Sequence, residues 1–271
     1  MRSSSAPPPS PHDRAVTSGV IDLNADVGES FGTYRLGDDE ELIPSLTSVS
    51  VAGGLHAGDP RIIARTVARA EEFGVAVGAH PGYPDLAGFG RRDMDLGPAE
   101  LRDVVLYQVG AVAAFTKGHG LQHVKPHGAM YNRAARDQAQ AEAIVDALLH
   151  YDERLIHVVL AGSPWERIAR AAGARVAREA FADRAILTDG SLLPRSQPGA
   201  IIHDPDAVAE RAVRIATDGV VQAVDGSDVP VTADTLCIHG DTVGAAGLAA
   251  LIRRELERAG VALRAMGETI P

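Results

Sequence analysis

The sequence predicts an α/β fold, a seven-stranded parallel (β/α) barrel of the TIM-like type. From Val20 onward, a short apolar run, a turn containing glycine or proline and an amphipathic helix follow one another repeatedly. Such units connect parallel strands through right-handed crossovers, which leaves an open doubly wound sheet or a closed barrel. An open sheet concentrates its chemistry at one or two strand ends, whereas a barrel draws on many. Six of the seven predicted strand ends carry ionisable residues, which favours the barrel.

Seven segments have the composition of strands, since each is short, apolar and bounded by glycine, proline or charged residues. They are 20–28, 48–55, 75–82, 121–128, 155–163, 174–183 and 235–241. The clearest helices are 60–73, 98–118, 204–224 and 245–260. Pro60 and Pro98 occupy the expected first helical positions, and Asp59 precedes Pro60 as an N-cap. A final segment, 261–270, is expected to add an edge strand.

The composition restricts the class of protein. The chain has 271 residues, a net charge of −10 and one cysteine, Cys237, so no intrachain disulfide can form and a reducing compartment is expected. The negative charge argues against a nucleic-acid partner, and the apolar runs are shorter than the roughly 20 residues of a membrane span. Residues 1–19 are rich in serine and proline without an apolar core segment, so we expect a disordered leader, not a signal peptide. A single barrel domain, 20–271, located in the cytoplasm, is expected to follow.

The longest irregular stretch is 183–204, directly after the sixth predicted strand. Loops of this length are usually functional or disordered. Because the segment follows a strand end that carries Glu179 and Asp183, we favour an active-site lid over a passive insertion.

The first two strand ends carry a dense group of polar residues. Asp22, Asn24 and Asp26 alternate along one face of the first strand, and Glu29 follows in the turn. A hydrogen-bonded buried carboxylate with a helix cap is the alternative explanation, but three polar residues on one strand face favour a functional role. His56 lies between glycines after the second strand, where it has little packing function.

The third strand end adds a histidine and two cations. His80 ends this strand among small residues, which leave its ring room to approach another group. Arg91 and Arg92 follow a glycine-rich loop, where a guanidinium suits a carboxylate or a phosphate. Adjacent surface arginines are as often simply solvated, so both explanations stay open.

The stretch LQHVKPHGAMYN spaces His123, Lys125 and His127 two residues apart, so an extended chain directs all three the same way. Lys125 is one of only two lysines beside 24 arginines, and its compact ammonium suits a phosphate or a developing oxyanion. His123 is explained as well by a core histidine with satisfied hydrogen bonds. His127, next to Gly128, is the better site candidate.

The last strand end carries His239 and Asp241, with Cys237 two residues earlier, which we interpret as a small hydrophobic residue. A divalent metal is possible: the principal candidates are Asp26, His56 and His80, joined by Glu29, His127 and His239. No H-E-x-x-H or paired-cysteine spacing occurs, so a metal site rests only on the convergence of strand ends. The sequence also lacks the G-x-S-x-G elbow, the G-x-x-x-x-G-K-[ST] loop and a strand-associated G-x-G-x-x-G.

Seven ordered blocks resemble the LamB/YcsF family: DLNADVGESFG, AGGLHAGDP, GAHPGYPDLAGFGRR, HVKPHGAMYN, EAFADR, LLPRSQPGA and IHGD. They extend from about Ile21 to Met266. The resemblance implies a barrel similar to the glycoside hydrolase/deacetylase superfamily. It also implies ATP-dependent hydrolytic opening of 5-oxo-L-proline (pyroglutamate) to L-glutamate, with ADP and phosphate as the other products. ATP with Mg²⁺ is then the expected cofactor, and subunits B and C are the expected partners.

The positions that match the family fall into two expected groups. The catalytic group comprises Asp26, His56, His80, Lys125 and His127. The substrate- and phosphate-binding group comprises Asn24, Glu29, Arg91, Arg92, Glu179, Asp183, Arg184, Arg195, His239 and Asp241. We expect Asp26 to act as general base, oriented by His56 or His80, and Lys125 to contact phosphate or an oxyanion. One of Arg91, Arg92 and Arg195 is expected to hold the substrate carboxylate.

The chain departs from the family pattern at four positions. Ala25 and Gly53 stand where the family usually has cysteine, and Ala185 and Ile186 stand where an aromatic residue is common. Two other functions stay open. One is a stand-alone, metal-dependent, deacetylase-like amidohydrolase that needs no ATP, and the other is a subunit that only binds the lactam and delivers it to its partners.

Overall fold

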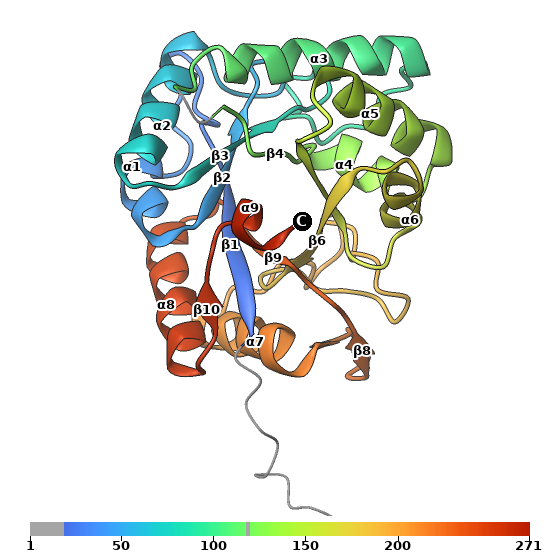
Figure 1. The fold of residues 1–271 in the computed structure, drawn as a ribbon. Helices are drawn as coiled ribbons and strands as arrows, with labels where there is room; N and C mark the ends of the chain where they lie inside the picture. Colours follow the sequence, from blue (N-terminus) through green and yellow to red (C-terminus); the bar gives the residue numbers. More distant parts are fainter. Residues whose placement is uncertain (1–18, 118–119) are drawn as a thin grey trace, which may run out of the picture.

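The strands close into a barrel in the computed structural model, which describes residues 19–117 and 120–271. Seven parallel strands pair in the order β1 (Val20–Val27), β2 (Ser48–Ala52), β3 (Ala76–His80), β4 (His123–Val124), β5 (Ile156–Leu160), β6 (Arg175–Phe181) and β9 (Thr235–Ile238), and β9 pairs with β1 (Figure 1). Asn24 of β1 therefore lies opposite both Ser48 of β2 and Cys237 of β9. The predicted seven-stranded parallel barrel is confirmed. The predicted leader, residues 1–19, lies outside the described residues except for Gly19.

Helices surround the strands on the outside of the barrel (Figure 1). The longer ones are α2 (Pro60–Glu72), α3 (Pro98–Ala113), α5 (Gln138–Tyr151), α6 (Pro164–Ala171), α7 (Pro205–Asp218) and α8 (Ala245–Arg258). The short ones are α1 (Asp39–Leu42), the 3₁₀ helix η1 (Ile43–Ser45), α4 (Gly128–Ala134) and α9 (Met266–Thr269). Asp59 caps α2 as predicted, since its carboxylate accepts hydrogen bonds from the backbone N–H groups of Arg61 and Ile62. Among the described residues, no helix has the length and apolar character needed to cross a membrane.

Two predicted helices end earlier than the sequence pattern indicated. α3 stops at Ala113 instead of residue 118, where the last turn tightens: the N–H groups of Phe115 and Thr116 donate to the carbonyls three residues earlier, those of Val112 and Ala113. α7 stops at Asp218, because Gly219 adopts a left-handed conformation with φ of 66°. The remainder of that predicted helix forms a strand, β7 (Val220–Gln222), which pairs antiparallel with β8 (Asp228–Pro230).

Two predicted strands are shorter than expected. β4 has only two paired residues, and the chain beyond it contains Pro126, which has no N–H group to donate to a sheet. The final segment forms the two-residue strand β10 (Ala262–Leu263) beside β1 and then turns into α9. Met266 of α9 is fully buried against Ile156 and Val158 of β5, so this last segment supplies an apolar cluster at one end of the barrel.

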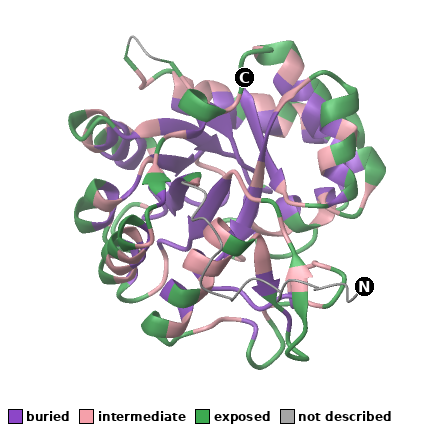
Figure 2. Cartoon of the chain, turned by 60° about the horizontal axis from the view of Figure 1, so that its bottom comes forward, coloured by how far each residue is buried: buried purple, intermediate pink, exposed green. Residues whose placement is uncertain are grey.

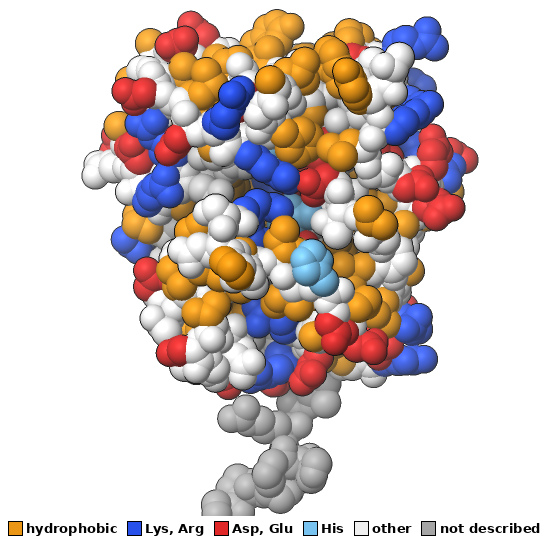
Figure 3. Space-filling view, turned by 180° about the vertical axis from the view of Figure 1, so that it is seen from behind, with side chains coloured by type: hydrophobic (Ala, Val, Ile, Leu, Met, Phe, Trp, Pro, Cys, Tyr) orange, Lys and Arg blue, Asp and Glu red, His pale blue; other side chains and the backbone are white. Residues whose placement is uncertain are grey.

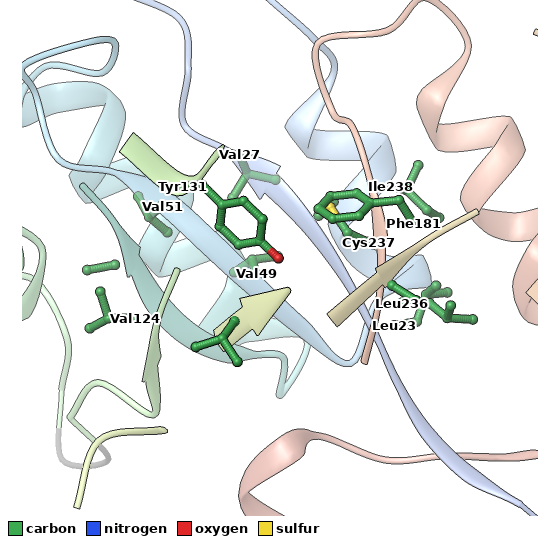
Figure 4. Close-up of a cluster of buried hydrophobic side chains, with 14 of the residues drawn as sticks. Leu23, Val27, Val49, Val51, Val124, Tyr131, Phe181, Leu236, Cys237 and Ile238 are labelled. Atoms are coloured by element: carbon green, nitrogen blue, oxygen red, sulfur yellow. The ribbon is translucent and has the colours of Figure 1, made fainter. Parts of the chain in front are cut away.

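Successive strand residues face opposite sides of the barrel wall. The residues of one set are apolar and pack against the surrounding helices in the main core. Figure 4 shows several of them: Leu23, Val27, Val49, Val51, Val124, Leu236 and Ile238. Figure 2 shows the strands buried at the centre and the exposed surface confined mainly to helices and loops. The alternate set is largely polar, and it includes Asp22, Asn24, Asp26, Ser48, Ser50, His123, Lys125 and Glu179. Apolar packing outside the wall thus leaves the interior free for ionisable groups.

Asp22 and His123 occupy the deeper part of this polar interior. Burial raises the pKa of Asp22 to about 6, although hydroxyl groups of Thr235, Thr47 and Ser48 donate hydrogen bonds to its carboxylate. Burial likewise lowers the pKa of His123 to about 3, with a further contribution from Lys125. A Cβ on Gly78 would overlap the His123 ring, so this glycine makes room for His123, where the sequence had suggested room for His80.

Candidate active site

Lys125 lies at the centre of the site, directly beyond β4. Its ammonium Nζ lies 2.7 Å from Oδ1 of Asp26 and 3.0 Å from Oε1 of Glu179. It also contacts Asn24 Oδ1 at 3.2 Å and Cys237 Sγ at 2.8 Å. Burial alone would lower the pKa of Lys125, but Asp26, Cys237 and Glu179 outweigh it and hold the pKa well above its usual value. One permanently charged ammonium therefore links two buried carboxylates.

Asp26 connects Lys125 to the histidines. Its Oδ2 lies 3.3 Å from Nε2 of His80, and Nδ1 of His80 donates to the backbone carbonyl of Lys125 at 2.6 Å. Burial would raise the pKa of Asp26, but His80 and Lys125 together hold it well below its usual range. The Asp26 carboxylate is thus ionised and, for the same reason, a weak base.

A second cluster, which we call the Glu–His cluster, consists of Glu29, His56, His80 and His127. Glu29 Oε1 lies 3.6 Å from His56 Nε2 and 3.4 Å from His127 Nδ1. His127 Nδ1 in turn lies 3.0 Å from His80 Nε2, and its ring stacks on that of His56 with centroids 4.0 Å apart. Burial and, as the second cause, the negative charge of Asp26 raise the pKa of Glu29 well above its usual value. Burial lowers the pKa of both His56 and His127.

The loop after β3 closes over this cluster through two glycines. A Cβ on Gly82 would lie 2.5 Å from Nδ1 of His56, and one on Gly90 would lie 2.9 Å from Cδ2 of His127. Gln108 of α3 fixes the same loop, because its amide accepts from the Gly82 N–H at 2.9 Å and donates to the Gly82 carbonyl at 2.8 Å. The glycine-rich composition of the loop is therefore required for its close contact with the histidine rings.

On the other side of Asp26, His239 and Asp183 form a carboxylate–histidine pair. Nδ1 of His239 lies 2.7 Å from Oδ2 of Asp183, and the His239 ring stacks on Phe181 with centroids 5.6 Å apart. Burial would raise the pKa of Asp183, but His239 reverses the effect and lowers it. A carboxylate accepts only, so Nδ1 carries the proton and Nε2 is left as the free ring nitrogen.

The four candidate arginines have different environments. Arg91 forms an ion pair with Asp241, and buried Arg184 donates to the carbonyls of Ala200 and Leu193, which ties the 183–204 segment together. Arg92 forms an ion pair with Asp85 and does not line the site. Arg195 has no ion pair or hydrogen bond within residues 19–117 and 120–271. Burial and, as the second cause, the positive charge of Arg91 lower the pKa of Arg195.

A large chamber opens above these groups. Its volume is about 870 Å³, and a smaller recess reaches Asp26, His80, Lys125 and His239. Arg91 and Arg195 line both spaces. Figure 3, the side opposite that of Figure 1, shows basic side chains gathered near the middle of the molecule beside acidic and histidine groups. The 183–204 segment supplies one wall of the chamber, through Arg184 and residues from Leu187 to Ser196, and its role as an active-site lid stays a prediction.

Comparison with known proteins identifies the family. The model of the LamB/YcsF family matches residues 21–270. The chain belongs to the LamB/YcsF family. A relative from Syntrophobacter fumaroxidans, named as the A subunit of 5-oxoprolinase, is 56% identical over 248 residues, which cover 91% of this chain and 98% of the relative. A relative of the same name from Thermococcus onnurineus is 53% identical over 252 residues, covering 92% of this chain and 99% of the relative.

A solved structure of the same type is also similar. The crystal structure titled lactam utilization protein, from Thermus thermophilus, superimposes with a TM-score of 0.86 at 50% sequence identity. The match covers 91% of this chain and 99% of that one. The fold of this LamB/YcsF chain is therefore shared with a solved relative over nearly its whole length.

Sequence reasoning missed two residues of this LamB/YcsF site. Tyr131 and Asn132 of α4 line the recess beside Lys125, and Tyr131 is buried. Burial, followed by Glu179, raises the pKa of Tyr131 well above its usual value. Both lie in the first turns of the helix that follows His127, so polar residues there were the available signal.

Proposed function

We propose that this chain is the A subunit of a multi-subunit 5-oxoprolinase, which opens 5-oxo-L-proline to L-glutamate with consumption of ATP. The observation that carries the proposal is the buried group of Asp26, Lys125, His80 and His239 beneath a chamber with two arginines. The names of the 56% and 53% identical relatives support the same activity. Subunits B and C complete the enzyme.

Arg195 holds the carboxylate of the lactam. Arg91 is already paired with Asp241, and Arg184 already donates to two carbonyls, so their charges or donors are engaged. Arg195 is the guanidinium left without such a partner in the described part of the chain, and it borders the recess. A guanidinium binds a carboxylate through two parallel hydrogen bonds, which orients the ring as well as retaining it.

ATP with Mg²⁺ fits the larger chamber. A volume of about 870 Å³ lies within the range of roughly 300–1,000 Å³ typical of small-molecule sites. Arg91 lies at the border between the chamber and the recess, and its contact with Asp241 uses Nη2, so its other N–H groups can donate to a phosphate oxygen. The nucleotide supplies a phosphoryl group to the lactam oxygen, which makes the ring carbon a better electrophile.

His239 then acts as the general base. A water oxygen bonds to the ring carbon while its proton moves to Nε2 of His239, and Asp183 stabilises the resulting imidazolium. The C–N bond of the ring breaks, the nitrogen takes a proton, and γ-glutamyl phosphate forms. A second water hydrolyses this acyl phosphate to glutamate and phosphate. Asp26, which the sequence suggested as the base, instead positions Lys125 and His80, because its low pKa makes it a weak base.

The test is ATP-dependent release of glutamate from labelled 5-oxoproline, measured with and without the partner subunits. We expect His239→Gln in the reconstituted complex to lower turnover by about 10²–10⁴-fold, and Asp183→Asn to lower it by a similar factor. His203→Gln, an exposed histidine outside the recess, is the matched control. If His239→Gln retains near-normal turnover while Asp26→Asn loses it, the base is Asp26 and the assignment to His239 is wrong.

The Glu–His cluster favours one competing function, a metal-dependent amidohydrolase that acts alone. That function predicts hydrolysis of the lactam or of an acylated amide by the isolated chain without ATP. Glutamate release that requires ATP and the partner subunits contradicts it. If calorimetry shows that the isolated chain binds 5-oxoproline while His239→Gln and Asp26→Asn leave turnover unchanged, the chain is a binding subunit without chemistry of its own.

A further inference from the structure

We propose that Glu29, His56, His80 and His127 bind one divalent transition-metal ion of the Zn²⁺ type, separate from the Mg²⁺ that accompanies ATP. One donor atom from each residue lies within 4.8 Å of the other three, and all four residues are buried. The site shares His80 with the group beneath the chamber, but its occupancy can be measured without any lactam turnover.

The distances between donor atoms suit a small cation. Ligand atoms about 2.0–2.1 Å from a tetrahedral Zn²⁺ are separated from one another by roughly 3.4 Å. Here His80 Nε2 and His127 Nδ1 are 3.0 Å apart, His127 Nδ1 and Glu29 Oε1 are 3.4 Å apart, and His56 Nε2 and Glu29 Oε1 are 3.6 Å apart. These three separations lie within a few tenths of an ångström of that value, and the donor atoms of all four residues lie within 4.8 Å of one another.

Backbone carbonyls fix the tautomers of two histidines. A carbonyl only accepts, so the ring nitrogens that face one carry hydrogen: Nδ1 of His80 toward Lys125, and Nε2 of His127 toward Phe89 at 2.8 Å. When both rings are neutral, as metal binding requires, Nε2 of His80 and Nδ1 of His127 carry lone pairs 3.0 Å apart. The same Nε2 lies 3.3 Å from Oδ2 of Asp26, so Asp26 and the cation share this side of His80. Metal-binding histidines are held by outer hydrogen bonds of this kind.

A shared proton explains less of the cluster than a metal ion does. A proton between His80 and His127 would relieve the contact of their two lone pairs, but it would leave Glu29 and His56 unaccounted for. Among the described residues, Glu29 Oε1 and both ring nitrogens of His56 are buried without a hydrogen-bond partner. Buried polar atoms rarely remain unpaired. One divalent cation takes one ligand atom from each of the four side chains, so it accounts for Glu29 and for one of the two unpaired ring nitrogens of His56.

The donor set selects the class of ion. Three imidazoles and one carboxylate suit Zn²⁺, Fe²⁺, Co²⁺ or Ni²⁺, whereas Mg²⁺ and Ca²⁺ prefer oxygen ligands throughout. Asp26, a ligand candidate from the sequence, is bound to Lys125 instead, and Glu29 and His127 complete the set. The His56 and His127 rings are nearly parallel, with 9° between their planes. Metal binding therefore requires the His56 ring to tilt so that its Nε2 points at the ion.

The experiment uses the untagged full-length chain, stripped of metal by a chelator and then equilibrated with Zn²⁺ or Co²⁺. Metal per chain is measured by mass spectrometry after removal of excess ion, and Co²⁺ coordination is followed by visible absorption. We expect one ion per wild-type chain, a rise in Tm on binding, and no displacement by millimolar Mg²⁺. Loss of an outer-shell partner already costs about 10–100-fold in affinity, so Glu29→Gln and His127→Gln should cost at least that.

His203→Gln is the control, since it also removes one histidine but from an exposed position. It should retain one ion per chain with wild-type affinity. Both glutamine variants keep the size and polarity of the site, and circular dichroism checks that they fold. The proposal is overturned if the wild-type chain takes up no Zn²⁺ or Co²⁺, if Mg²⁺ displaces them, or if both glutamine variants bind as tightly as wild type. Because none of these measurements uses lactam turnover, failure here leaves the proposed 5-oxoprolinase activity standing.

Discussion

Replacing Lys125 with methionine tests whether the ion cluster in the barrel is as buried as the structure shows. Methionine keeps an unbranched side chain of similar length and removes the charge together with the N–H donors to Asn24 and Cys237. Lys125 neutralises Asp26 and Glu179 over 2.7 and 3.0 Å, and these carboxylates are 6% and 0% exposed. The substitution therefore leaves two buried negative charges without their common cation.

Breaking a buried ion pair from one side costs about 3–5 kcal/mol. His80 remains beside Asp26 and reduces the penalty there, whereas Glu179 keeps neutral neighbours, the amide of Asn24 at 3.2 Å and the buried Tyr131. We therefore expect Lys125→Met to lower the free energy of unfolding by about 3–5 kcal/mol, a large part of the roughly 5–15 kcal/mol typical of a domain. Glu179→Gln in the same chain should restore part of the loss, because it removes the worse of the two unpaired charges.

Urea unfolding at pH 7.5, followed by circular dichroism, gives the free energy for each variant. The control is Lys117→Met, the same substitution at the other lysine, which is exposed. It should change stability by no more than about 0.5 kcal/mol. A loss below about 1 kcal/mol for Lys125→Met, or a double variant less stable than Lys125→Met alone, would contradict the cost that we assign to these buried charges.

Three further predictions concern stability. Burial lowers the pKa of His157 to about 4, so protonation of His157 lowers the free energy of unfolding as pH falls from about 6.5 to 4. His157→Phe should remove up to about 3 kcal/mol of this decrease, at 1.36 kcal/mol per pKa unit. Equal acid loss in both proteins, by urea unfolding at pH 7.5 and 4.5, would contradict this. Burial raises the pKa of Asp22 to about 6, so its ionisation lowers the free energy of unfolding as pH rises from about 4 to 6. Asp22→Asn should therefore raise the free energy of unfolding by up to about 3 kcal/mol at pH 8 and by little at pH 4. An advantage at pH 4 as large as at pH 8 would refute that account. A Cβ on Gly240 would overlap the Asp26 carbonyl oxygen, so Gly240→Ala should destabilise the protein by about 1–3 kcal/mol. Gly247 of α8 has open space around it, so Gly247→Ala should not destabilise the protein. Thermal melts of the two variants measure the difference.

The barrel was predictable because its strand ends carry the chemistry. His80 ends one strand, and His56, Lys125 and His239 come shortly after three others. Parallel strands in a closed barrel bring their carboxyl ends to one rim. The boundaries were less predictable because local hydrogen bonds decide them. Nothing in the apolar pattern of residues 204–224 shows that Gly219 ends the helix and that the next residues form a hairpin.

Within the site, the sequence indicated which residues meet but not how they pair. Asp26 and Glu29 are three residues apart, yet Asp26 contacts Lys125 while Glu29 faces His56 and His127. That division depends on the turn after β1, which the residue types do not encode. Arg91 and Arg92 show the same limit, since adjacent side chains point to different partners, Asp241 and Asp85.

Cys237 illustrates how the polar interior changes the role of an apolar residue. Its thiol packs in the core, as predicted for a small hydrophobic residue, but it also lies 2.8 Å from the Lys125 ammonium. Burial raises the pKa of Cys237 well above its usual value, against the opposing effect of Lys125. The thiol is therefore a neutral acceptor for the ammonium and not a nucleophile, in agreement with the sequence interpretation.

Asp26 joins the two halves of the site through its two oxygens. Oδ1 holds Lys125, and Oδ2 faces His80, whose Nε2 belongs to the Glu–His cluster. A cation bound by the cluster would attract the negative charge of the Asp26 carboxylate toward Oδ2. The ion pair between Asp26 Oδ1 and Lys125 would then be weaker. Coupling between two binding events is reciprocal. If the proposed metal ion changes the affinity of the recess for an anionic substrate, that substrate changes the metal affinity of the cluster by the same factor.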